Sequence, residues 1–356
     1  VEVARTLRFK LEINSEDAEK LHSLIVEYSK LVKDFLKVLK HSRAILKPSK
    51  GKLHRYAYHF LRKKYNLHSN HVTSARDRAV EMVKASAYHK VFPDPETVPV
   101  RMFRDKTFFL NGKRIKIVIA PREHVTGKLI GGQFDEIERA RCAELIERDE
   151  EFFIHFIVKR KVNLEYPFVT RIGVDVNLER IAVSAVGEDG SVLATHLIEM
   201  NVKGRREYFL NRRRGNQRRK VRAGHEERDY FKNLIEQTTH QIITFIKNFE
   251  KPVVCLENLK NLIKRVRKRG GDVYPKFFYE EVHRRLVEKL TWEGIRVVFV
   301  PAMFTSVRCH RCGGYGKRYG KKFVCGKCGE FDADVNASAS IARRLPALKG
   351  EVSRWL

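Results

Sequence analysis

The sequence predicts an α/β protein with an additional β-barrel, divided into two lobes, and three observations support this fold class. Strand-like segments at both ends of residues 1–166 enclose a helical segment, which indicates one barrel with a helical insertion. Residues 171–301 follow the order β-β-β-α-β-α-β, which is typical of helices packed on a mixed sheet. Four cysteines within residues 309–328 form two Cys-x2-Cys pairs, which predict a small metal-binding ribbon.

The first half begins with a strand at residues 3–13 and continues into a helix. The segment NSED at residues 14–17 offers two cap candidates followed by two acids, as expected for a helix start. Two more helical segments, near residues 52–65 and 73–91, are rich in Lys, Arg, His and Tyr. The segment FPDPETVP then ends this small basic helical region, because its prolines break the pattern.

Strands return after Pro99. VRMF is one, and TFFLNGKRIKIVIA reads as a hairpin that turns at Asn111-Gly112. A second hairpin is expected around residues 148–150. Together with the first strand, these segments predict the barrel.

The second half begins with three strands over residues 171–200, the last two joined through Asp189-Gly190. A long basic helical segment follows, and PVVCLEN then reads as a central strand buried on both faces. A helix at residues 277–293 and the strand IRVVFVP complete an order that suits an RNase H-like fold. We therefore expect four parts: a barrel (1–13 and 97–166), a helical region (14–96), an RNase H-like domain (167–305 and 331–356) and a ribbon (306–330).

Charge is the strongest compositional signal. The 72 Lys and Arg exceed the 43 Asp and Glu enough to give a net charge of +29, which favours a polyanionic partner such as nucleic acid. A basic thermophile enzyme or a ribosome-associated protein with a solvated face is the alternative. The sequence contains no long apolar run and no apolar signal core at its start, so we expect a cytoplasmic, nucleoid-associated protein.

The cysteine pairs predict a structural zinc site. Cys309 and Cys312 are separated by twelve residues from Cys325 and Cys328, and two such turns can close a tetrahedral zinc. Four thiolates leave no open position for water or for a further ligand. Lysines and arginines of the intervening loop could contact phosphates, namely Lys317, Arg318, Lys321 and Lys322.

Three acids form the candidate active site. Asp175 lies within an apolar strand, Glu257 ends another, and Asp334 precedes small residues that favour close packing of a helix. Convergent carboxylates can bind two Mg²⁺ or Mn²⁺ ions that activate water for phosphodiester hydrolysis. The structural alternatives are a salt bridge for Asp175, a solvated strand end for Glu257 and a helix cap for Asp334. We expect Asp332 to be a solvated or capping neighbour instead.

These motifs resemble the TnpB family of insertion-sequence-encoded, RNA-guided nucleases, ancestors of type V CRISPR effectors. Gly173-Val174-Asp175, Leu256-Glu257-Asn258-Leu259 and Asp334-Val335-Asn336-Ala337 are similar to its three RuvC motifs, in order. PAMFTSVRCHRCG is similar to the segment that leads into its zinc finger. The resemblance is close over residues 168–345 and only architectural before them. Asn177 departs from the glycine common at that position, which could alter packing at the metal site.

The resemblance implies a DNA endonuclease of a transposable element. Asp175, Glu257 and Asp334 would be the Mg²⁺ ligands of a single RuvC site, and the four cysteines would bind one structural zinc. The barrel and helical region would be a wedge-like domain and a recognition region. A guide (omega) RNA, double-stranded DNA with a short motif beside the target, and a monomeric chain are further expectations.

Two basic runs are candidates for nucleic-acid backbone contacts. The first comprises Arg212, Arg213, Arg214, Arg218, Arg219, Lys220 and Arg222, and the second Lys264, Arg265, Arg267, Lys268 and Arg269. Each could instead be a solvated helix face or loop. Two other functions stay open: an RNA-guided DNA-binding regulator without cleavage, and a DNA-joining transposase.

Overall fold

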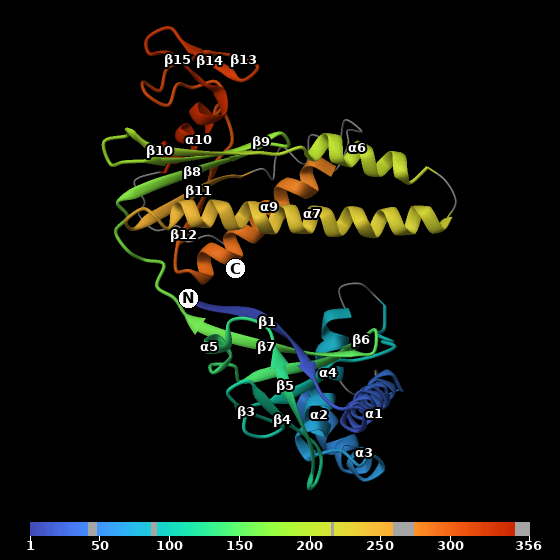
Figure 1. Ribbon diagram of the computed structural model, residues 1–356. Coiled ribbons are helices and arrows are strands. Elements are labelled where there is room, and N and C mark those ends of the chain that lie inside the picture. Colours follow the sequence, from blue (N-terminus) through green and yellow to red (C-terminus); the bar gives the residue numbers. More distant parts are fainter. Residues whose placement is uncertain (42–47, 87–90, 215–216, 259–273, 346–356) are drawn as a thin grey trace. The chain divides into compact units, whose positions relative to one another are not determined.

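The structure is a computed structural model that describes residues 1–41, 48–86, 91–214, 217–258 and 274–345 (Figure 1). The chain divides into two compact units, Glu2–Arg160 and Lys161–Leu356, and Val1 belongs to the second. Each unit contains its own sheet. Within the described ranges, no helix combines the length and the apolar character that crossing a membrane requires.

The unit Glu2–Arg160 is built on a seven-stranded sheet with the order β2-β6-β7-β1-β5-β4-β3. Its strands are β1 (Glu2–Glu12), β2 (Val100–Phe103), β3 (Phe108–Asn111), β4 (Arg114–Ala120), β5 (Glu123–Ile130), β6 (Cys142–Arg148) and β7 (Glu151–Lys161). Its helical segments are α1 (Ser15–His41), α2 (Lys50–Leu53), the π-helical η1 (His54–Tyr58), α3 (His59–Lys64), α4 (Ser69–Ser86) and α5 (Phe134–Ile137). The helices from α1 to α4 are inserted between two strands of one sheet, as predicted.

Local signals explain most of these boundaries. The Asp17 amide donates to Asn14 Oδ1 over 2.7 Å, so the predicted cap of α1 is confirmed. The second hairpin turns at Asp149 and Glu150, where the sequence predicted it, and both residues have positive φ. The first hairpin differs by one residue: Asn111 pairs with Arg114, so the turn is Gly112-Lys113. Gly112 takes the positive φ that this turn needs, which explains why it follows the strand directly.

Two expectations for this unit need correction. Strand β5 was not predicted as a separate strand, although it pairs with both β1 and β4. The sheet is a curled half-barrel rather than a full barrel (Figure 1). The edge strands β2 and β3 are four residues each, and the described residues link their ends through a single isolated bridge, Arg104 to Phe108.

The second unit contains a five-stranded mixed sheet with the order β10-β9-β8-β11-β12. Its strands are β8 (Thr170–Val176), β9 (Arg180–Val186), β10 (Val192–Glu199), β11 (Pro252–Asn258) and β12 (Arg296–Pro301), and its helices are α6 (Val202–Arg212), α7 (Gln217–Ile246), α9 (Tyr274–Trp292) and α10 (Ala333–Arg343). β8, β9 and β10 are antiparallel neighbours, whereas β11 is parallel to β8 and β12. The order of elements predicted for residues 171–301 is therefore confirmed.

This sheet is covered on both faces (Figure 1). Ile172 and Val174 of β8 share a core with α7 and α9, while Val253 and Cys255 of β11 pack with Ile341 of α10 on the other face. α10 approaches the sheet closely at Gly173, where a Cβ would lie 1.9 Å from the carbonyl oxygen of Ser338. Only glycine allows this contact, as the small residues of α10 suggested.

A three-stranded ribbon precedes α10. Its strands are β13 (Lys317–Tyr319), β14 (Lys322–Cys325) and β15 (Gly329–Asp332), joined as antiparallel neighbours. Its core is small and includes Cys309, Phe323, Cys325 and Ala333. The ribbon therefore has few apolar contacts of its own to stabilise it.

Candidate active site

The sheet brings the first two acids together. Val174 pairs with Leu256 across the parallel strands β8 and β11, and Asp175 and Glu257 directly follow these residues. Because side chains alternate along a strand, both acids are directed to the face that α10 covers, opposite Ile172 and Val174. They are thus neighbours at the carboxyl end of two parallel strands.

Asp175 is buried, with 8% of its surface exposed. Its Oδ2 accepts a hydrogen bond of 2.8 Å from Asn177 Nδ2, so the residue that departs from the family pattern orients the acid. Burial, then Glu257, then Asp334 raise the pKa of Asp175 to about 7. Burial is the main cause of this shift, and the two neighbouring carboxylates add to it. The predicted salt-bridge alternative for Asp175 has no support among the described residues.

Glu257 is positioned by the loop after β12. Thr305 Oγ1 donates to Glu257 Oε1 over 2.5 Å. Burial raises the pKa of Glu257, and the Thr305 hydrogen bond and the charge of Arg344 partly oppose that effect. Glu257 is therefore partly buried and oriented by a hydroxyl donor, not a freely solvated strand end.

Asp334 lies in the first turn of α10 and is 4% exposed. Its two oxygens are held by different arginines. Arg318 Nη2 lies 2.7 Å from Oδ1, and Arg180 lies 2.5 Å (Nη2) and 2.8 Å (Nε) from Oδ2. Arg180 is itself buried and also contacts Asp332 at 2.8 Å. A metal ion bound to Asp334 must share the carboxylate with these guanidinium groups or displace them.

Asp332 is the N-cap of α10. Its Oδ1 accepts the amides of Asp334 at 2.9 Å and Val335 at 3.1 Å. The capping role predicted for Asp332 is confirmed, and the alternative of Asp334 as the cap is wrong. Asp334 is thus left for other contacts.

The three acids share one neighbourhood, but not one tight cluster. The charges of Glu257 and Asp334 both raise the pKa of Asp175. A hollow of about 430 Å³ beside Asp334 is lined in part by Arg180, Lys203, Arg318 and Lys321. The ligand atoms of the three acids do not all lie within 4.8 Å of one another. The carboxylate oxygens of these acids are hard ligands, which nevertheless suit a divalent cation such as Mg²⁺.

The four predicted cysteines do form a tight cluster. The sulfurs of Cys309, Cys312, Cys325 and Cys328 lie within 4.8 Å of one another, the one such group in the described parts of the chain. Cys312 Sγ and Cys325 Sγ are 3.6 Å apart, close to the separation of about 3.8 Å that tetrahedral Zn–S bonds require. The cluster could hold a metal ion. Cys255, by contrast, is fully buried, and its pKa is raised to about 12 by burial.

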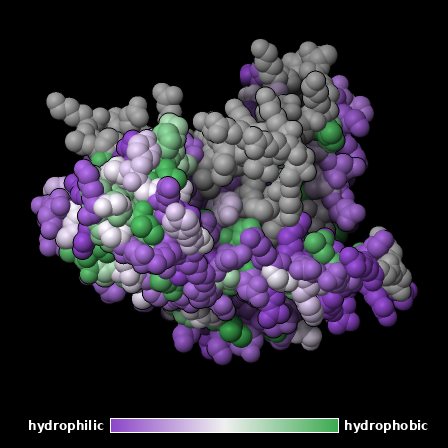
Figure 2. Space-filling model, turned by 90° about the horizontal axis from the view of Figure 1, so that it is seen from above, coloured by the Kyte–Doolittle hydropathy of each residue, from purple (hydrophilic) through white to green (hydrophobic). Residues whose placement is uncertain are grey.

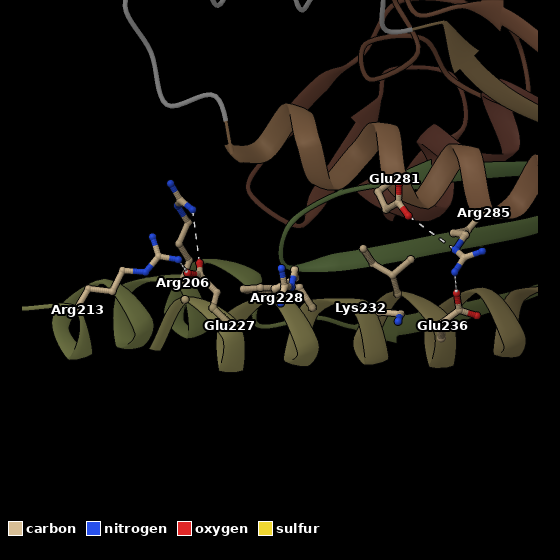
Figure 3. A pocket seen from close by; sticks show the side chains of 11 residues that line it. Arg206, Arg213, Glu227, Arg228, Lys232, Glu236, Glu281 and Arg285 are labelled. Atoms are coloured by element: carbon tan, nitrogen blue, oxygen red, sulfur yellow. Dashed lines mark hydrogen bonds and ion pairs between the residues drawn. The ribbon is translucent and has the colours of Figure 1, made fainter. Parts of the chain in front are cut away.

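The first basic run lies where α6 meets α7, and part of it is paired. Arg212 and Arg222 form ion pairs with Glu226, and Arg213 pairs with the buried Glu227. Figure 3 shows Arg213 and Glu227 in a hollow of about 430 Å³ that α9 completes with Glu281 and Arg285. Arg214, Arg218 and Lys220 are exposed and have no ion pair with any described residue. Arg219 is also exposed. The second run, Lys264, Arg265, Arg267, Lys268 and Arg269, lies outside the described residues.

Sequence reasoning missed two residues that orient the acids. Arg180 begins an otherwise apolar strand, and a buried charge in that context could have indicated a carboxylate partner. Thr305 gave no signal, because its role depends on a loop that folds back onto β11.

Comparison with known proteins agrees with this architecture. A family model described as Cas12f1-like, TNB domain matches residues 279–341. The CRISPR-associated endodeoxyribonuclease Cas12f1 of Sulfoacidibacillus thermotolerans is 28% identical over 132 residues, which are 35% of this chain and 30% of that protein. A TnpB-like protein of Methanocaldococcus jannaschii is 24% identical over 265 residues, which are 67% of this chain and 92% of that protein. The chain is similar to TnpB-family proteins over the residues that these matches cover. The family resemblance predicted from the sequence is confirmed.

The fold of this chain also resembles a solved structure. A chain from the cryo-EM structure of a Cas12f1–sgRNA–target DNA complex superposes with a TM-score of 0.62 at 13% identity, covering 96% of this chain and 99% of that chain. The sequence match, in contrast, spans less than a third of the Cas12f1 of S. thermotolerans and most of the TnpB-like protein. The likeness in structure shows a shared fold.

Proposed function

We propose that this chain is an RNA-guided, metal-dependent DNA endonuclease of a transposable element. The observation that carries the proposal is the convergence of Asp175, Glu257 and Asp334 on one end of a mixed sheet, in a chain with a net charge of +29. Its relatives include proteins named as CRISPR-associated endodeoxyribonucleases, and the complex with the similar fold contains a guide RNA and target DNA. These names support a nucleic-acid substrate.

We propose the following assignments, which the family resemblance supports. We assign residues 167–305 and 331–356 to an RNase H-like (RuvC) domain with the zinc ribbon 306–330 inserted, although 259–273 and 346–356 of this assignment lie outside the described residues. Residues 1–13 and 97–166 are a wedge-like domain, and residues 14–96 are a recognition region. Arg214, Arg218 and Lys220 are the strongest candidates of the first basic run for contacts with phosphates, because their charges are not neutralised by described acids.

The residues of the site divide the work of hydrolysis. Asp175 and Glu257 would hold a divalent ion together, while Asn177 and Thr305 fix the orientation of each carboxylate. Asp334 would complete the ligand set, with Arg318 and Arg180 beside it able to attract the scissile phosphate. Two Mg²⁺ ions would supply water activation and stabilisation of the leaving oxygen. The four cysteines would hold one structural zinc.

An RNA-guided DNA-binding regulator is the second candidate. The pairing of both Asp334 oxygens with arginines favours it, because a permanently paired Asp334 could not bind a metal ion. Both functions require guide RNA and a double-stranded DNA target. They differ in whether the DNA is cut.

One experiment tests the proposal and separates the candidates. The full chain is purified with its bound RNA, that RNA is sequenced, and plasmid DNA carrying the matching target is added with Mg²⁺. We expect cleavage that stops after RNase treatment and returns when the sequenced RNA is added back. Cleavage without RNA contradicts the guided mechanism, and stable target binding without any cleavage favours the regulator.

A further inference from the structure

An exposed aromatic cluster lies in the loop that joins β12 to the cysteine ribbon. Phe304 and Tyr315 are 43% and 65% exposed, and their ring centroids are 6.0 Å apart at an angle of 89°. The Arg308 guanidinium lies 5.7 Å from the Phe304 ring and 5.3 Å from the Tyr315 ring. We call these three residues the aromatic platform. Such exposure of large apolar side chains costs free energy unless a ligand covers them.

The platform is held rigidly. The Arg308 carbonyl accepts hydrogen bonds from Asn336 Nδ2 at 2.8 Å and Ser340 Oγ at 3.2 Å, both from α10. Arg308 and Tyr315 form an antiparallel bridge, and the Arg308 amide donates to the Phe304 carbonyl over 3.2 Å. Phe304 has a φ of 68°, an uncommon conformation for an aromatic residue. A rigid platform loses little conformational entropy when it binds.

The platform is also linked to the acids. Thr305, which directly follows Phe304, donates the hydrogen bond that orients Glu257. A ligand that stacks on Phe304 is therefore one residue away from a group that positions the proposed metal site. On the face drawn in Figure 2, apolar residues occur as small groups within a mostly hydrophilic surface.

Charge identifies the class of ligand. Residues 306–332 contain seven Lys and Arg but two acids, so the platform lies in a strongly positive segment. A planar guanidinium beside two aromatic rings offers π and cationic faces, which suit a nucleobase attached to a phosphate chain. An apolar protein partner would gain nothing from Arg308 and its basic surroundings.

We propose that Phe304, Arg308 and Tyr315 form a stacking platform for an unpaired nucleotide of the DNA strand that enters the carboxylate site. This inference rests on the proposed nuclease function and adds a residue-level substrate site to it. Base stacking on aromatic residues is insensitive to sequence, as a guided nuclease requires, since pairing with the guide supplies the specificity.

Short single-stranded DNA oligonucleotides test the platform directly. The full chain, kept free of Mg²⁺ to prevent cleavage, is titrated with a hexamer and with the same hexamer carrying abasic residues. We expect the hexamer with bases to bind about tenfold more tightly, since stacking contributes on the order of 1–3 kcal/mol per base. A hexamer containing 2-aminopurine should lose fluorescence on binding, which reports stacking.

Variants assign this preference to residues. Phe304→Ala with Tyr315→Ala should remove the preference for bases and the 2-aminopurine quenching, with affinity for the abasic hexamer unchanged. Phe304→Tyr and Tyr315→Phe should keep both. Phe109→Ala is the matched control, since Phe109 is 39% exposed in the other unit. Zinc content reports whether each variant retains the ribbon.

Several results would overturn the platform. The platform is wrong if the unmodified chain binds the abasic hexamer as tightly as the hexamer with bases. It is also wrong if the variant with both alanine substitutions still prefers the hexamer with bases. A change from dimer to monomer in that variant would show instead that the patch joins two copies. If the unmodified chain stacks bases but does not cut guided targets, the proposed nuclease function is wrong and the platform stands.

Discussion

At the scale of single residues, the two aspartates that begin α10 have different roles. Asp332 caps the helix and pairs with Arg180, whereas Asp334 lies among the other acids and is our proposed metal ligand. Their spacing alone could not distinguish them. The cap hydrogen bonds do, because Oδ1 of Asp332 accepts two amides of the helix backbone.

This difference predicts opposite outcomes for two substitutions. Asp332→Ala should keep most cleavage activity and lower the free energy of unfolding by about 1 kcal/mol, the usual cost of losing an N-cap. Asp334→Ala should lower the cleavage rate by at least roughly a thousandfold, because one metal ligand is lost. Guided cleavage rates and urea unfolding of both variants check this. Equal loss of activity in both would contradict the assignment.

The pH dependence of stability tests whether Asp175 is buried close to the other two acids. The pKa of Asp175 is raised from 3.8 to about 7, so the folded chain keeps a proton that the unfolded chain has released. The contribution of Asp175 to the free energy of unfolding is therefore present at low pH and lost as pH rises through this interval. In protein free of Mg²⁺, the stability of the unmodified chain should fall from about pH 4 to 7 relative to Asp175→Asn.

Urea unfolding of both proteins at several pH values measures this difference. Dialysis without chelators removes Mg²⁺ and leaves the ribbon metal in place. Mg²⁺ should restore the stability of the unmodified chain near pH 7. If the stability of the unmodified chain stayed constant or rose with pH relative to Asp175→Asn, Asp175 would be paired with a cationic side chain instead.

At the scale of elements, the local sequence pattern predicted the strands and helices more accurately than the turns and the sheet edges. The strand β11 is buried at four consecutive positions, as its apolar run indicated. The turn of the first hairpin moved by one residue, because strand pairing, not the Asn-Gly preference, determines which residues bridge the strands. The half-barrel could not be predicted, since closure depends on how far two short edge strands can pair.

The ribbon is the element whose stability depends most on a bound metal. We expect one zinc per chain by elemental analysis, because four sulfurs gather around a small apolar core. Cys325→Ser should lose the zinc and increase hydrogen exchange across residues 306–332. Cys142→Ser is the matched control and should keep it, since Cys142 lies in β6, in the other unit. Folded protein with no zinc would refute the prediction.

At the scale of the whole molecule, the sequence identified the acids and the cysteines, but not what surrounds them. Asp175, Glu257 and the four cysteines lie in motifs whose spacing carries the signal. Arg180 and Thr305 become visible only when β9 and the loop after β12 fold against α10 and β11. Contacts between segments more than forty residues apart have no local pattern in a single sequence.

The basic segments show the same limit. Counting charges predicted a dense basic run from Arg212 to Arg222, yet three of its arginines pair with Glu226 or Glu227. These two acids lie in α7, beyond the end of the basic run, and they neutralise the three arginines. The charges that stay available to a polyanion are therefore fewer than the composition implies.

The central claim is that one carboxylate site cuts DNA under the direction of RNA. Its most direct test is cleavage of a guided target by Glu257→Gln, which removes one negative charge and keeps the shape of the side chain. We predict that this variant binds the RNA as tightly as the unmodified chain, keeps its zinc and cuts no DNA in the presence of Mg²⁺. Full cleavage by Glu257→Gln would contradict the account.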